Sequence, residues 1–445
     1  MRYIYPKKVP IYKFLFNANS LTKNPIPFHK KYFNECSDSF TVANSKKRKI
    51  FLTRDAGIAK QVLKQKHKKY IKSEIQTKFL SKYVGYGLLT SNGQLWLKQR
   101  RLIQPAFHKQ KLEKLIEIIS STVKEELLKI KTNEFIDVYP IMNELAFNVV
   151  AKSLFSFSSD KETLRRLQFI IAELQDFIVK ELRQPHKRWW LNLTGQVKKK
   201  LKLSKESRQL ILNIINKRRE SNETHDDLLD MLLAVTYEDD GSVMSDEQLI
   251  DEILILFVAG HETTANALTF ATYLLANNTQ YIAQIREESK EIQDTSLSIG
   301  SLAQLPVAKA VVDETMRLYP PAWITDRVAV EDDDLGKYQI EKGAIIGISF
   351  YEIHRDPRHW NNPNDFFPER FVGEEAKKHS KYYYPFGAGP RMCIGNNFAI
   401  YEMLLTLVNL LNNFDLESSD EEMYINPLVT LRPVNAKVKF KKLYE

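Results

Sequence analysis

One stretch of this chain decides its fold: Phe386-Gly387-Ala388-Gly389-Pro390-Arg391-Met392-Cys393-Ile394-Gly395, followed by an apolar helical run from Phe398 to Leu411. Glycine and proline favour a tight turn that ends where the helix begins. The helix dipole and backbone N–H groups stabilise a thiolate at a helix amino terminus, so Cys393 is suited to be an anionic metal ligand. A buried structural cysteine is the alternative, but it explains neither the three glycines nor Arg391 beside the thiol.

The same stretch resembles the haem loop of the cytochrome P450 family, Phe-x-x-Gly-x-Arg-x-Cys-x-Gly, at every fixed position. The resemblance implies haem b (iron protoporphyrin IX) as the cofactor, with Cys393 as the axial thiolate that pushes electron density onto iron. It also implies that Arg391 pairs with a haem propionate and that Phe386 and Gly387 belong to the cofactor-binding loop.

A second signature lies in a predicted long helix. Ser245 and Gln248 form a capping-box pattern, and no proline occurs before Asn277, which predicts a helix of about thirty residues. Its middle reads Ala259-Gly260-His261-Glu262-Thr263-Thr264. Glycine costs about 1 kcal/mol in a helix interior, and a buried acid and hydroxyl add to that cost.

An ordinary surface turn of helix is one interpretation of this hexapeptide. In the P450 family the pattern lies over the iron, and the resemblance favours a functional role. It implies that Thr263 holds the oxygen and water network and that Glu262 feeds protons to it. Gly260 would permit a local opening of the helix beside the cofactor, and His261 has no ligand role.

Glu314 and Arg317 stand one helical turn apart on a second predicted helix, which begins at Pro306 and is ended by Pro320. Alone, such an ion pair is commonplace. The resemblance matches it to a Glu-x-x-Arg pair that forms a buried triad with the arginine of a Pro-Glu-Arg-Phe motif, here Arg370. The implied role is architectural, under the haem loop.

Three further residues match positions that contact haem propionates in the family: Trp96, Arg100 and Arg327. For Trp96 and Arg100 the alternative is a core tryptophan beside a solvated arginine. His354 either caps local backbone or approaches the haem edge, and the structural interpretation is favoured.

Composition describes a folded globular protein, because 43% of the 445 residues are hydrophobic and 27% are charged. Two cysteines, Cys36 and Cys393, exclude a disulfide framework and fit a reducing compartment. The apolar patch 11–16 is interrupted by Lys13 and is too short to span a bilayer, and no signal-peptide pattern occurs. We expect a soluble, cytoplasmic monomer without a membrane span, and no nucleic-acid signature accompanies the basic charge.

Hydrophobic periodicity predicts a mainly α protein with a small β region, forming one haem-binding domain over 1–445 with the P450 fold. The expected helices include 55–79, 110–128, 141–155, 161–182 and 205–218, and the expected strands are 39–42, 49–52, 344–350 and 428–440. No reductase motif follows the haem loop, so electrons are expected from a separate protein.

By analogy with the family, the substrate pocket is apolar and aromatic, which favours a lipid, terpenoid or fatty acid as the molecule that is hydroxylated or demethylated. Polar groups at Thr325 and Asp326, with Trp189, Trp190 and Trp323 as stacking surfaces, leave oxidative O-demethylation of a methylated sugar as the alternative. The predicted lining comprises Phe79, Tyr83, Tyr86, Leu88, Phe257, Val258, Trp323, Ile324 and Thr325.

The net charge of +10 suits an acidic electron carrier. We expect a ferredoxin with its ferredoxin reductase, or a flavodoxin-type carrier, to dock on a basic cluster, with solvating lysines as the alternative. A peroxide-using haem-thiolate enzyme and a haem sensor are competing classes, but neither needs the Glu262 and Thr263 relay, which favours use of dioxygen. The cluster comprises Lys98, Arg101, Lys109, Lys111 and Lys114.

Overall fold

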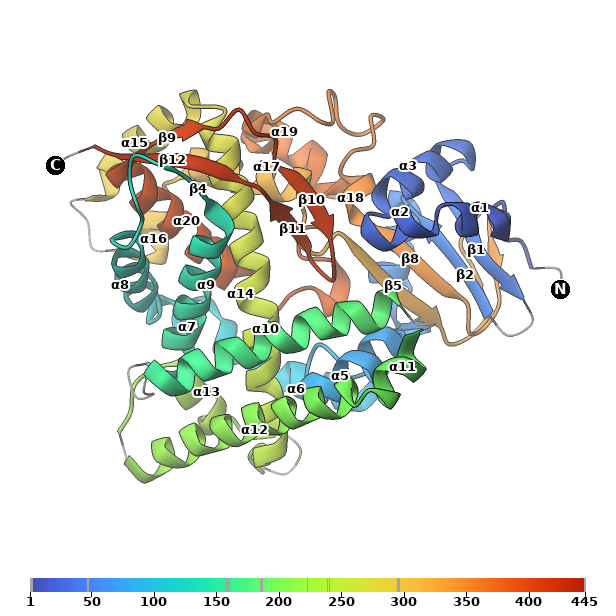
Figure 1. Cartoon of the computed structure of the whole chain (residues 1–445), viewed down its shortest axis with the longest axis horizontal. Coiled ribbons are helices and arrows are strands. Elements are labelled where there is room, and N and C mark those ends of the chain that lie inside the picture. The colour runs from blue at the N-terminus through green and yellow to red at the C-terminus, as the bar shows by residue number, and fades with distance from the viewer. Residues whose placement is uncertain are drawn as a thin grey trace. The chain divides into compact units, whose positions relative to one another are not determined.

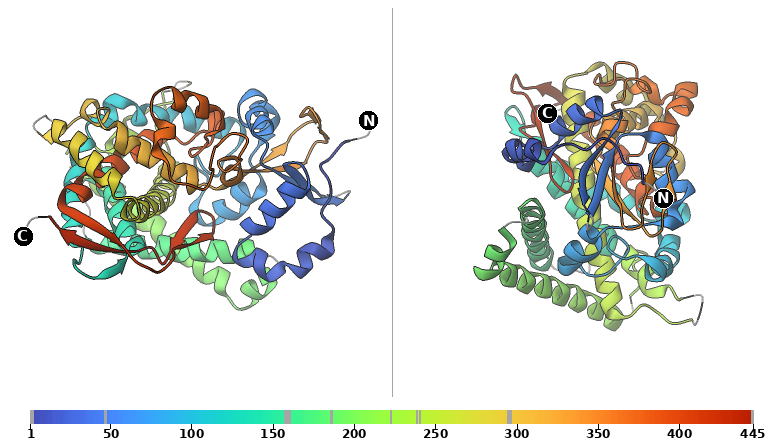
Figure 2. Two further views of the ribbon diagram at one scale, coloured as in Figure 1. Left: turned by 90° about the horizontal axis from the view of Figure 1, so that it is seen from above. Right: turned by 90° about the vertical axis from the view of Figure 1, so that its right-hand side faces the viewer.

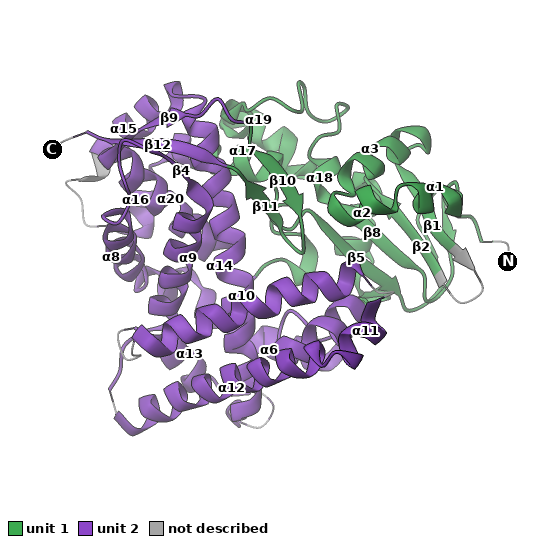
Figure 3. Ribbon diagram, in the orientation of Figure 1, with its two compact units in different colours: residues 1–73, 309–393, 422–435 green, residues 74–308, 394–421, 436–445 purple. Residues whose placement is uncertain are grey.

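The structure is a computed structural model that describes residues 3–45, 48–156, 161–184, 187–221, 223–237, 239, 241–293 and 297–443 (Figure 1). The chain forms two compact units, each described by itself (Figure 3). Unit 1 comprises residues 1–73, 309–393 and 422–435, and unit 2 comprises residues 74–308, 394–421 and 436–445.

A five-stranded sheet is the frame of unit 1, with the strand order β1-β2-β8-β5-β3. Strands β2 and β8 run parallel, with Phe51 opposite Ile346, and the other neighbours are antiparallel. Both residues are fully buried, and they belong to a core cluster that also contains Leu63 and Ala388. The residues just before Cys393 therefore pack into the core that supports the sheet. The strands are β1 (Ser39–Ser45), β2 (Arg48–Thr53), β3 (Tyr70–Ile71), β5 (Ile324–Ala329) and β8 (Ile345–Ser349).

Short helices and two hairpins complete unit 1. Helix α17 begins in the last residues of unit 2 and continues into unit 1. The hairpins are β6 (Asp333–Asp334) with β7 (Gln339–Ile340), and β10 (Tyr424–Pro427) with β11 (Leu431–Val434). The helices are α1 (Ile11–Phe16), α2 (Ala18–Lys23), α3 (Ile26–Glu35), α4 (Ala56–Lys60), α17 (Pro306–Leu318), α18 (Phe350–Ile353) and α19 (Gly373–His379).

Unit 2 is built around the long helix α14 (Asp246–Ala276), which packs against α9, α12 and α20. In the left view of Figure 2, the line of sight runs nearly along the axis of α14. By length and composition alone α14 could cross a membrane, but 72% of its most apolar window is buried, as in the core helix of a globular unit.

The remaining elements of unit 2 surround α14. A three-stranded antiparallel sheet, in the order β4-β12-β9, is formed by β4 (Phe135–Asp137), β12 (Lys437–Lys442) and β9 (Phe414–Ser418). The helices are α5 (Ser81–Val84), α6 (Gly93–Ile103), α7 (Lys109–Glu113), α8 (Ile116–Leu127), α9 (Val138–Phe155), α10 (Lys161–Arg183), α11 (Arg188–Leu193), α12 (Gln196–Ser221), α13 (Leu228–Ala234), α15 (Gln280–Gln293), α16 (Ile299–Leu302) and α20 (Asn396–Asn413).

The two helices with sequence punctuation are confirmed. Ser245 is the N-cap of α14, and its Oγ accepts a hydrogen bond from Gln248 N at 3.2 Å. Helix α17 begins at Pro306 and ends at Leu318, just before the predicted proline stop.

Three expected elements are wrong. The range 110–128 is divided into α7 and α8 by a turn at 114–115. The range 55–79 is not one helix: after α4 come a π-helical turn at Gln61–Gln65, a 3-10 turn, β3 and a second π-helical stretch at Ile75–Leu80. Pairing of Tyr70 with Ala329 across β3 and β5 overrides the helical periodicity. The range 428–440 is divided into β11 and β12 by a turn at Asn435, whose φ is +61°.

Candidate active site

The cysteine loop is held by its own backbone and by one close approach. Cys393 N donates to Phe386 O at 3.0 Å, which closes the loop. Gly389 has φ +72°, and a Cβ there would lie 1.9 Å from Leu63 O on the π-helical turn, so only glycine fits. Cys393 is exposed, and α20 begins three residues later at Asn396.

A buried histidine connects this loop to α17. Tyr384 N donates to His354 Nε2 at 2.8 Å, and Gly387 N donates to Tyr384 O at 3.0 Å. Arg317 Nη1 donates to His354 O at 2.8 Å. Burial, with the nearby Arg317 charge, lowers the pKa of His354 to about 3, so the ring is neutral and accepts through Nε2. His354 therefore has a structural role, as expected, but the backbone that it binds is not local: Tyr384 lies 30 residues further along the chain.

Glu314, Arg317 and Arg370 lie together as a buried ion cluster. Glu314 Oε2 accepts from Arg317 Nε at 2.6 Å, and Glu314 Oε1 accepts from Arg370 Nε at 3.3 Å and from Phe367 N at 2.8 Å. The two arginines also donate to backbone carbonyls, among them Asp365 O at 3.0 Å from Arg317. One carboxylate thus serves both guanidinium groups, and backbone carbonyl oxygens of unit 1 accept their other hydrogen bonds.

The predicted propionate contacts of unit 1 form a second charged pair. Burial lowers the pKa of Arg327 on β5. Burial and then repulsion by Arg327 lower the pKa of Arg391 to about 10. Two partly desolvated guanidinium groups near each other favour an anionic ligand with a pair of carboxylates. With the Cys393 thiol in the same unit, this donor set fits haem b.

The centre of α14 carries the predicted relay. Thr263 Oγ1 donates to Ala259 O at 2.7 Å, within the helix. Glu262 is buried, and its Oε2 accepts from Gln175 Nε2 of α10 at 3.0 Å. A Cβ on Gly260 would lie 3.2 Å from Val150 of α9, so this glycine permits close helix packing. Because α14 is α-helical from Asp246 to Ala276, the local opening implied by the resemblance is not seen in this range.

His261 points into the packing between α9 and α14. Its Nδ1 lies 2.8 Å from Phe257 O, and its ring meets Phe147 edge-on at 5.7 Å. These contacts agree with the absence of a ligand role.

Trp96 and Arg100 lie one turn apart on α6, and both are partly exposed. Arg100 Nε donates to Gln104 Oε1 at 3.3 Å. This pair belongs to unit 2, whereas Arg327 and Arg391 belong to unit 1. The structure therefore brings together the members of each pair.

The predicted pocket residues of unit 2 have mixed environments. Tyr83 is buried and donates from its hydroxyl to Glu181 Oε2 at 2.8 Å, whereas Tyr86 is exposed and Leu88 is half-buried. Phe79 lies under the Arg188 guanidinium at 4.0 Å.

Two α14 residues of the predicted lining differ in depth. Phe257 is fully buried and stacks on Phe147 of α9 at 5.5 Å between ring centroids. Val258 is half-buried and packs against the cluster that contains Tyr83 and Phe177.

In unit 1, Trp323 is buried with one face covered by His29 at 6.1 Å, and its Nε1 donates to Leu428 O at 3.1 Å. Ile324 and Thr325 are half-buried on β5. Trp189 and Trp190 are exposed on α11 and contact each other edge-on.

A glycine-rich cysteine loop, an arginine pair and a helix with an acid and a hydroxyl define a haem-thiolate enzyme. The family model described as Cytochrome P450 matches residues 5–440, and the chain belongs to the cytochrome P450 family. The heme domain of cytochrome P450DA has the same fold, with a TM-score of 0.84, 22% identity, and coverage of 99% of this chain and 98% of that one.

The relatives describe the reaction class. A cytokinin hydroxylase of Arabidopsis thaliana is 30% identical over 419 residues, covering 91% of this chain and 80% of that protein. A cyclooctat-9-en-7-ol 5-monooxygenase of Streptomyces melanosporofaciens is 29% identical over 335 residues, covering 75% and 73%. The protein is thus a P450 monooxygenase with haem b. Because the relatives come from plants, animals and bacteria, they do not assign it to a soluble bacterial type.

Proposed function

We propose that this monooxygenase hydroxylates or oxidatively demethylates a small, mainly apolar organic molecule in the cytoplasm, with electrons from a separate carrier. The observation that carries this proposal is the cluster of apolar side chains in the segments expected to line the pocket. Val258, Leu80 and Leu89 are half-buried there and pack against Tyr83 and Phe177. An apolar lining with few polar groups is typical of sites for apolar ligands.

Each group of residues has a distinct task. Cys393 would supply the thiolate that holds the haem iron, and Arg327 and Arg391 would hold propionates. The family resemblance implies the same role for Trp96 and Arg100. When bound, haem b supplies the redox-active iron at which dioxygen is reduced. The Glu314 cluster, acting through His354 and Tyr384, keeps the cysteine loop in register.

Glu262 and Thr263 move protons. The Glu262 carboxylate is buried and accepts a hydrogen bond from Gln175 Nε2, which restricts its orientation next to Thr263 in the chain. The Thr263 hydroxyl donates to Ala259 O, so its lone pairs can accept a hydrogen bond from a proton donor. The hydroxyl must rotate away from Ala259 O before its own proton can be passed on.

The printed activities of relatives support the substrate class. Besides the two relatives above, an 11-oxo-beta-amyrin 30-oxidase of Medicago truncatula is 31% identical over 379 residues, covering 80% of this chain and 72% of that protein. Trp323 is buried, which disfavours stacking of a sugar ring on its indole.

The test is a substrate panel with haem-loaded enzyme, a ferredoxin, its reductase and NADPH. Fatty acids and terpenoid alcohols are compared with O-methyl sugars by difference absorbance and by product analysis. We expect a substrate-induced Soret shift and an oxygenated product with an apolar compound. A shift and product with the methyl sugar alone would overturn the substrate class, and turnover with hydrogen peroxide but not with ferredoxin would overturn the electron source.

Two variants test the residue roles. Reduced parent enzyme with carbon monoxide should show the red-shifted Soret band of thiolate ligation, and Cys393→His should lose it. Thr263→Ala should retain haem and substrate binding but divert electrons into peroxide. The same band in Cys393→His, or unchanged product per electron in Thr263→Ala, contradicts the respective role.

A further inference from the structure

The segment Gly85–Thr90 joins α5 to α6 and carries the predicted pocket residues Tyr86 and Leu88. It is tied to the first half of α14. Tyr86 N donates to Asp251 Oδ2 at 2.6 Å, and Leu88 N donates to Glu252 Oε2 at 2.9 Å. Two carboxylates adjacent in the sequence therefore hold alternate backbone amides of one loop.

Both carboxylates are buried, and both have further partners in unit 2. Asp251 also accepts from Arg208 of α12, and Glu252 Oε1 accepts from Gln248 Nε2 at 2.9 Å. The same Gln248 amide donates to Tyr86 O at 3.1 Å. Because a buried carboxylate is costly unless it is hydrogen-bonded, the position of the loop and the charges of α14 depend on each other.

Two glycines make this approach possible. Gly85 has φ +81°, and a Cβ there would lie 2.0 Å from Asp251 Oδ1. A Cβ on Gly87 would lie 2.7 Å from Glu252 Oε2. The loop closes on itself through Thr90 Oγ1, which donates to Gly85 O at 2.7 Å. The backbone thus meets the carboxylates directly.

The anchors and the proton relay share one helix. Glu252 precedes Thr263, and Asp251 precedes Glu262, by eleven residues of uninterrupted α-helix. Eleven residues make about three turns at 3.6 residues per turn, so anchor and relay lie on the same face, roughly 16 Å apart along the axis. A rigid helix therefore sets the distance from the loop to the relay.

We propose that Asp251 and Glu252 are positioning residues that fix Tyr86 and Leu88 relative to Thr263 and thereby set which molecules reach the haem. This inference rests on the proposed function of the segment as pocket lining. Neither carboxylate is assigned a step in the reaction.

The first test is amide hydrogen exchange of the haem-loaded protein. In Glu252→Ala the exchange at Leu88 should quicken by about tenfold or more, because an amide bond to a charged acceptor is lost. Glu252→Gln retains an acceptor oxygen and should quicken it less, and Asp251→Asn should act likewise at Tyr86. Glu117→Ala is the control, because it removes an exposed carboxylate of unit 2, on α8. Parent-like exchange in Glu252→Ala refutes the anchoring.

The second test measures access without turnover. Imidazole and the bulkier 4-phenylimidazole are titrated against the ferric haem by absorbance, and the ratio of their dissociation constants is compared. We expect the ratio to change by about fivefold in Glu252→Ala, less in Glu252→Gln, and not in Glu117→Ala. Fast exchange with an unchanged ratio refutes the selectivity role. Absence of monooxygenation in the parent would refute the proposed function instead, and it leaves both readouts intact.

Discussion

Two networks of charged side chains in unit 1 have similar bonds and different surroundings. The Glu314 cluster is dry, since the side chains of Glu314 and Arg317 are 0% exposed and that of Arg370 is 7% exposed. The second network, around Asp38, is wetter, since the Arg358 side chain is 54% exposed. Removing a partner from a dry cluster strands a charge, whereas water solvates a charge left at the surface.

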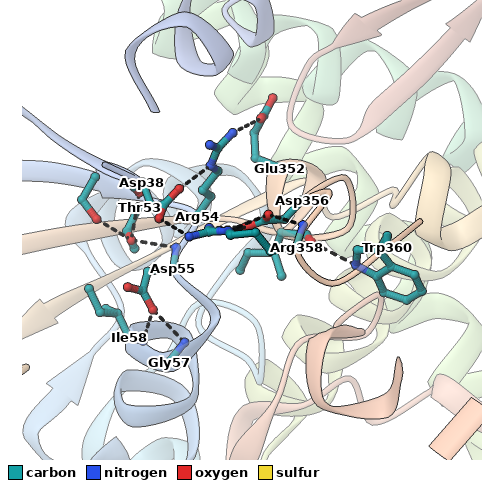
Figure 4. A network of polar contacts seen from close by, with 12 residues as sticks. Asp38, Thr53, Arg54, Asp55, Gly57, Ile58, Glu352, Asp356, Arg358 and Trp360 are labelled. Atoms are coloured by element: carbon teal, nitrogen blue, oxygen red, sulfur yellow. Dashed lines mark hydrogen bonds and ion pairs between the residues drawn. The ribbon is translucent and has the colours of Figure 1, made fainter. Parts of the chain in front are cut away.

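Figure 4 shows how the second network joins the start of the sheet to the segment after α18. Asp38 accepts from Arg54 Nε at 2.9 Å and from Arg358 Nη1 at 2.7 Å, and Arg358 Nε also donates to Asp356 Oδ1 at 2.9 Å. Arg54 Nη1 lies 3.6 Å from Glu352 Oε2. These charges share partners across several segments, but solvent reaches one end of the network.

The largest effect is expected from breaking the dry cluster. Glu314→Gln keeps the shape but removes the negative charge between Arg317 and Arg370, which should cost about 3–5 kcal/mol of unfolding free energy. Through His354 and Tyr384 the loss should reach the cysteine loop, so the protein should not retain haem. The measurement is the Soret absorbance per protein after gel filtration, with a thermal melt. Full haem content at the parent melting temperature would contradict the prediction.

The effect of burial can also be tested at a histidine elsewhere in unit 1. Burial lowers the pKa of His29 to about 4, from 6.5. As the pH falls, His29 of the unfolded chain binds a proton before His29 of the folded chain does. The free energy of unfolding is therefore unaffected by this group above pH 6.5, and it decreases as the pH falls toward 4, by at most about 1.4 kcal/mol per pH unit. His29→Phe should flatten the pH dependence of the denaturation midpoint between pH 6.5 and 4. His108→Gln, at an exposed position, is the control, and equal slopes in all three proteins would refute the prediction.

Breaking the wetter network should matter less. Arg358→Gln removes a guanidinium that is itself exposed but leaves the buried Asp356 carboxylate with fewer partners, so the expected loss is about 1–3 kcal/mol, with haem retained. Thermal melts of Arg358→Gln, Asp356→Asn and the double variant give the coupling between the two residues. Haem loss comparable to that of Glu314→Gln would contradict the prediction that the two networks differ in importance.

Fully exposed charges should leave stability unchanged and act only on a partner. Lys109 and Lys111 are exposed on α7, whereas Lys98 pairs with Asp239 at 3.0 Å and Lys114 pairs with Asp226 at 2.6 Å. The free energy of unfolding of a Lys109→Glu, Lys111→Glu variant should lie within about 0.5 kcal/mol of that of the parent. Its reduction by ferredoxin should be slower and less sensitive to salt, because such steering is screened over about 8 Å at physiological ionic strength. Stopped-flow reduction across a salt series measures this. A flat salt response in the parent, with the variant reduced equally fast, would remove the support for docking.

The structural features that could be predicted from the sequence are mostly those set by local patterns. The cap at Ser245, the prolines around α17 and the glycines before Cys393 each act within a few residues, so their elements are visible in the sequence. The range 55–79 was not predictable in this way, because the pairing of β3 with β5 joins segments far apart in the chain.

Some site residues could be predicted from local motifs, whereas others could not. Glu314, Arg317 and Arg370 follow from motifs that resemblance makes specific. Gln175 and the loop anchors Asp251 and Glu252 do not, because an amide or an acid on a helix is typical of an ordinary surface. Their roles depend on partners that are nearby only in the folded chain.

The close approach of Gly389 to Leu63 brings together two segments that are synthesised at different times. The cysteine loop lies against a turn that leaves the ribosome more than roughly 300 residues earlier, and at about 5–20 residues per second the interval is roughly 15 to 65 seconds. During this interval the early segment, including the buried side chains of Val62 and Leu63, lacks the loop that covers it. Because Cys393 is synthesised late, ligation of haem by this thiolate cannot begin until most of the chain has been made.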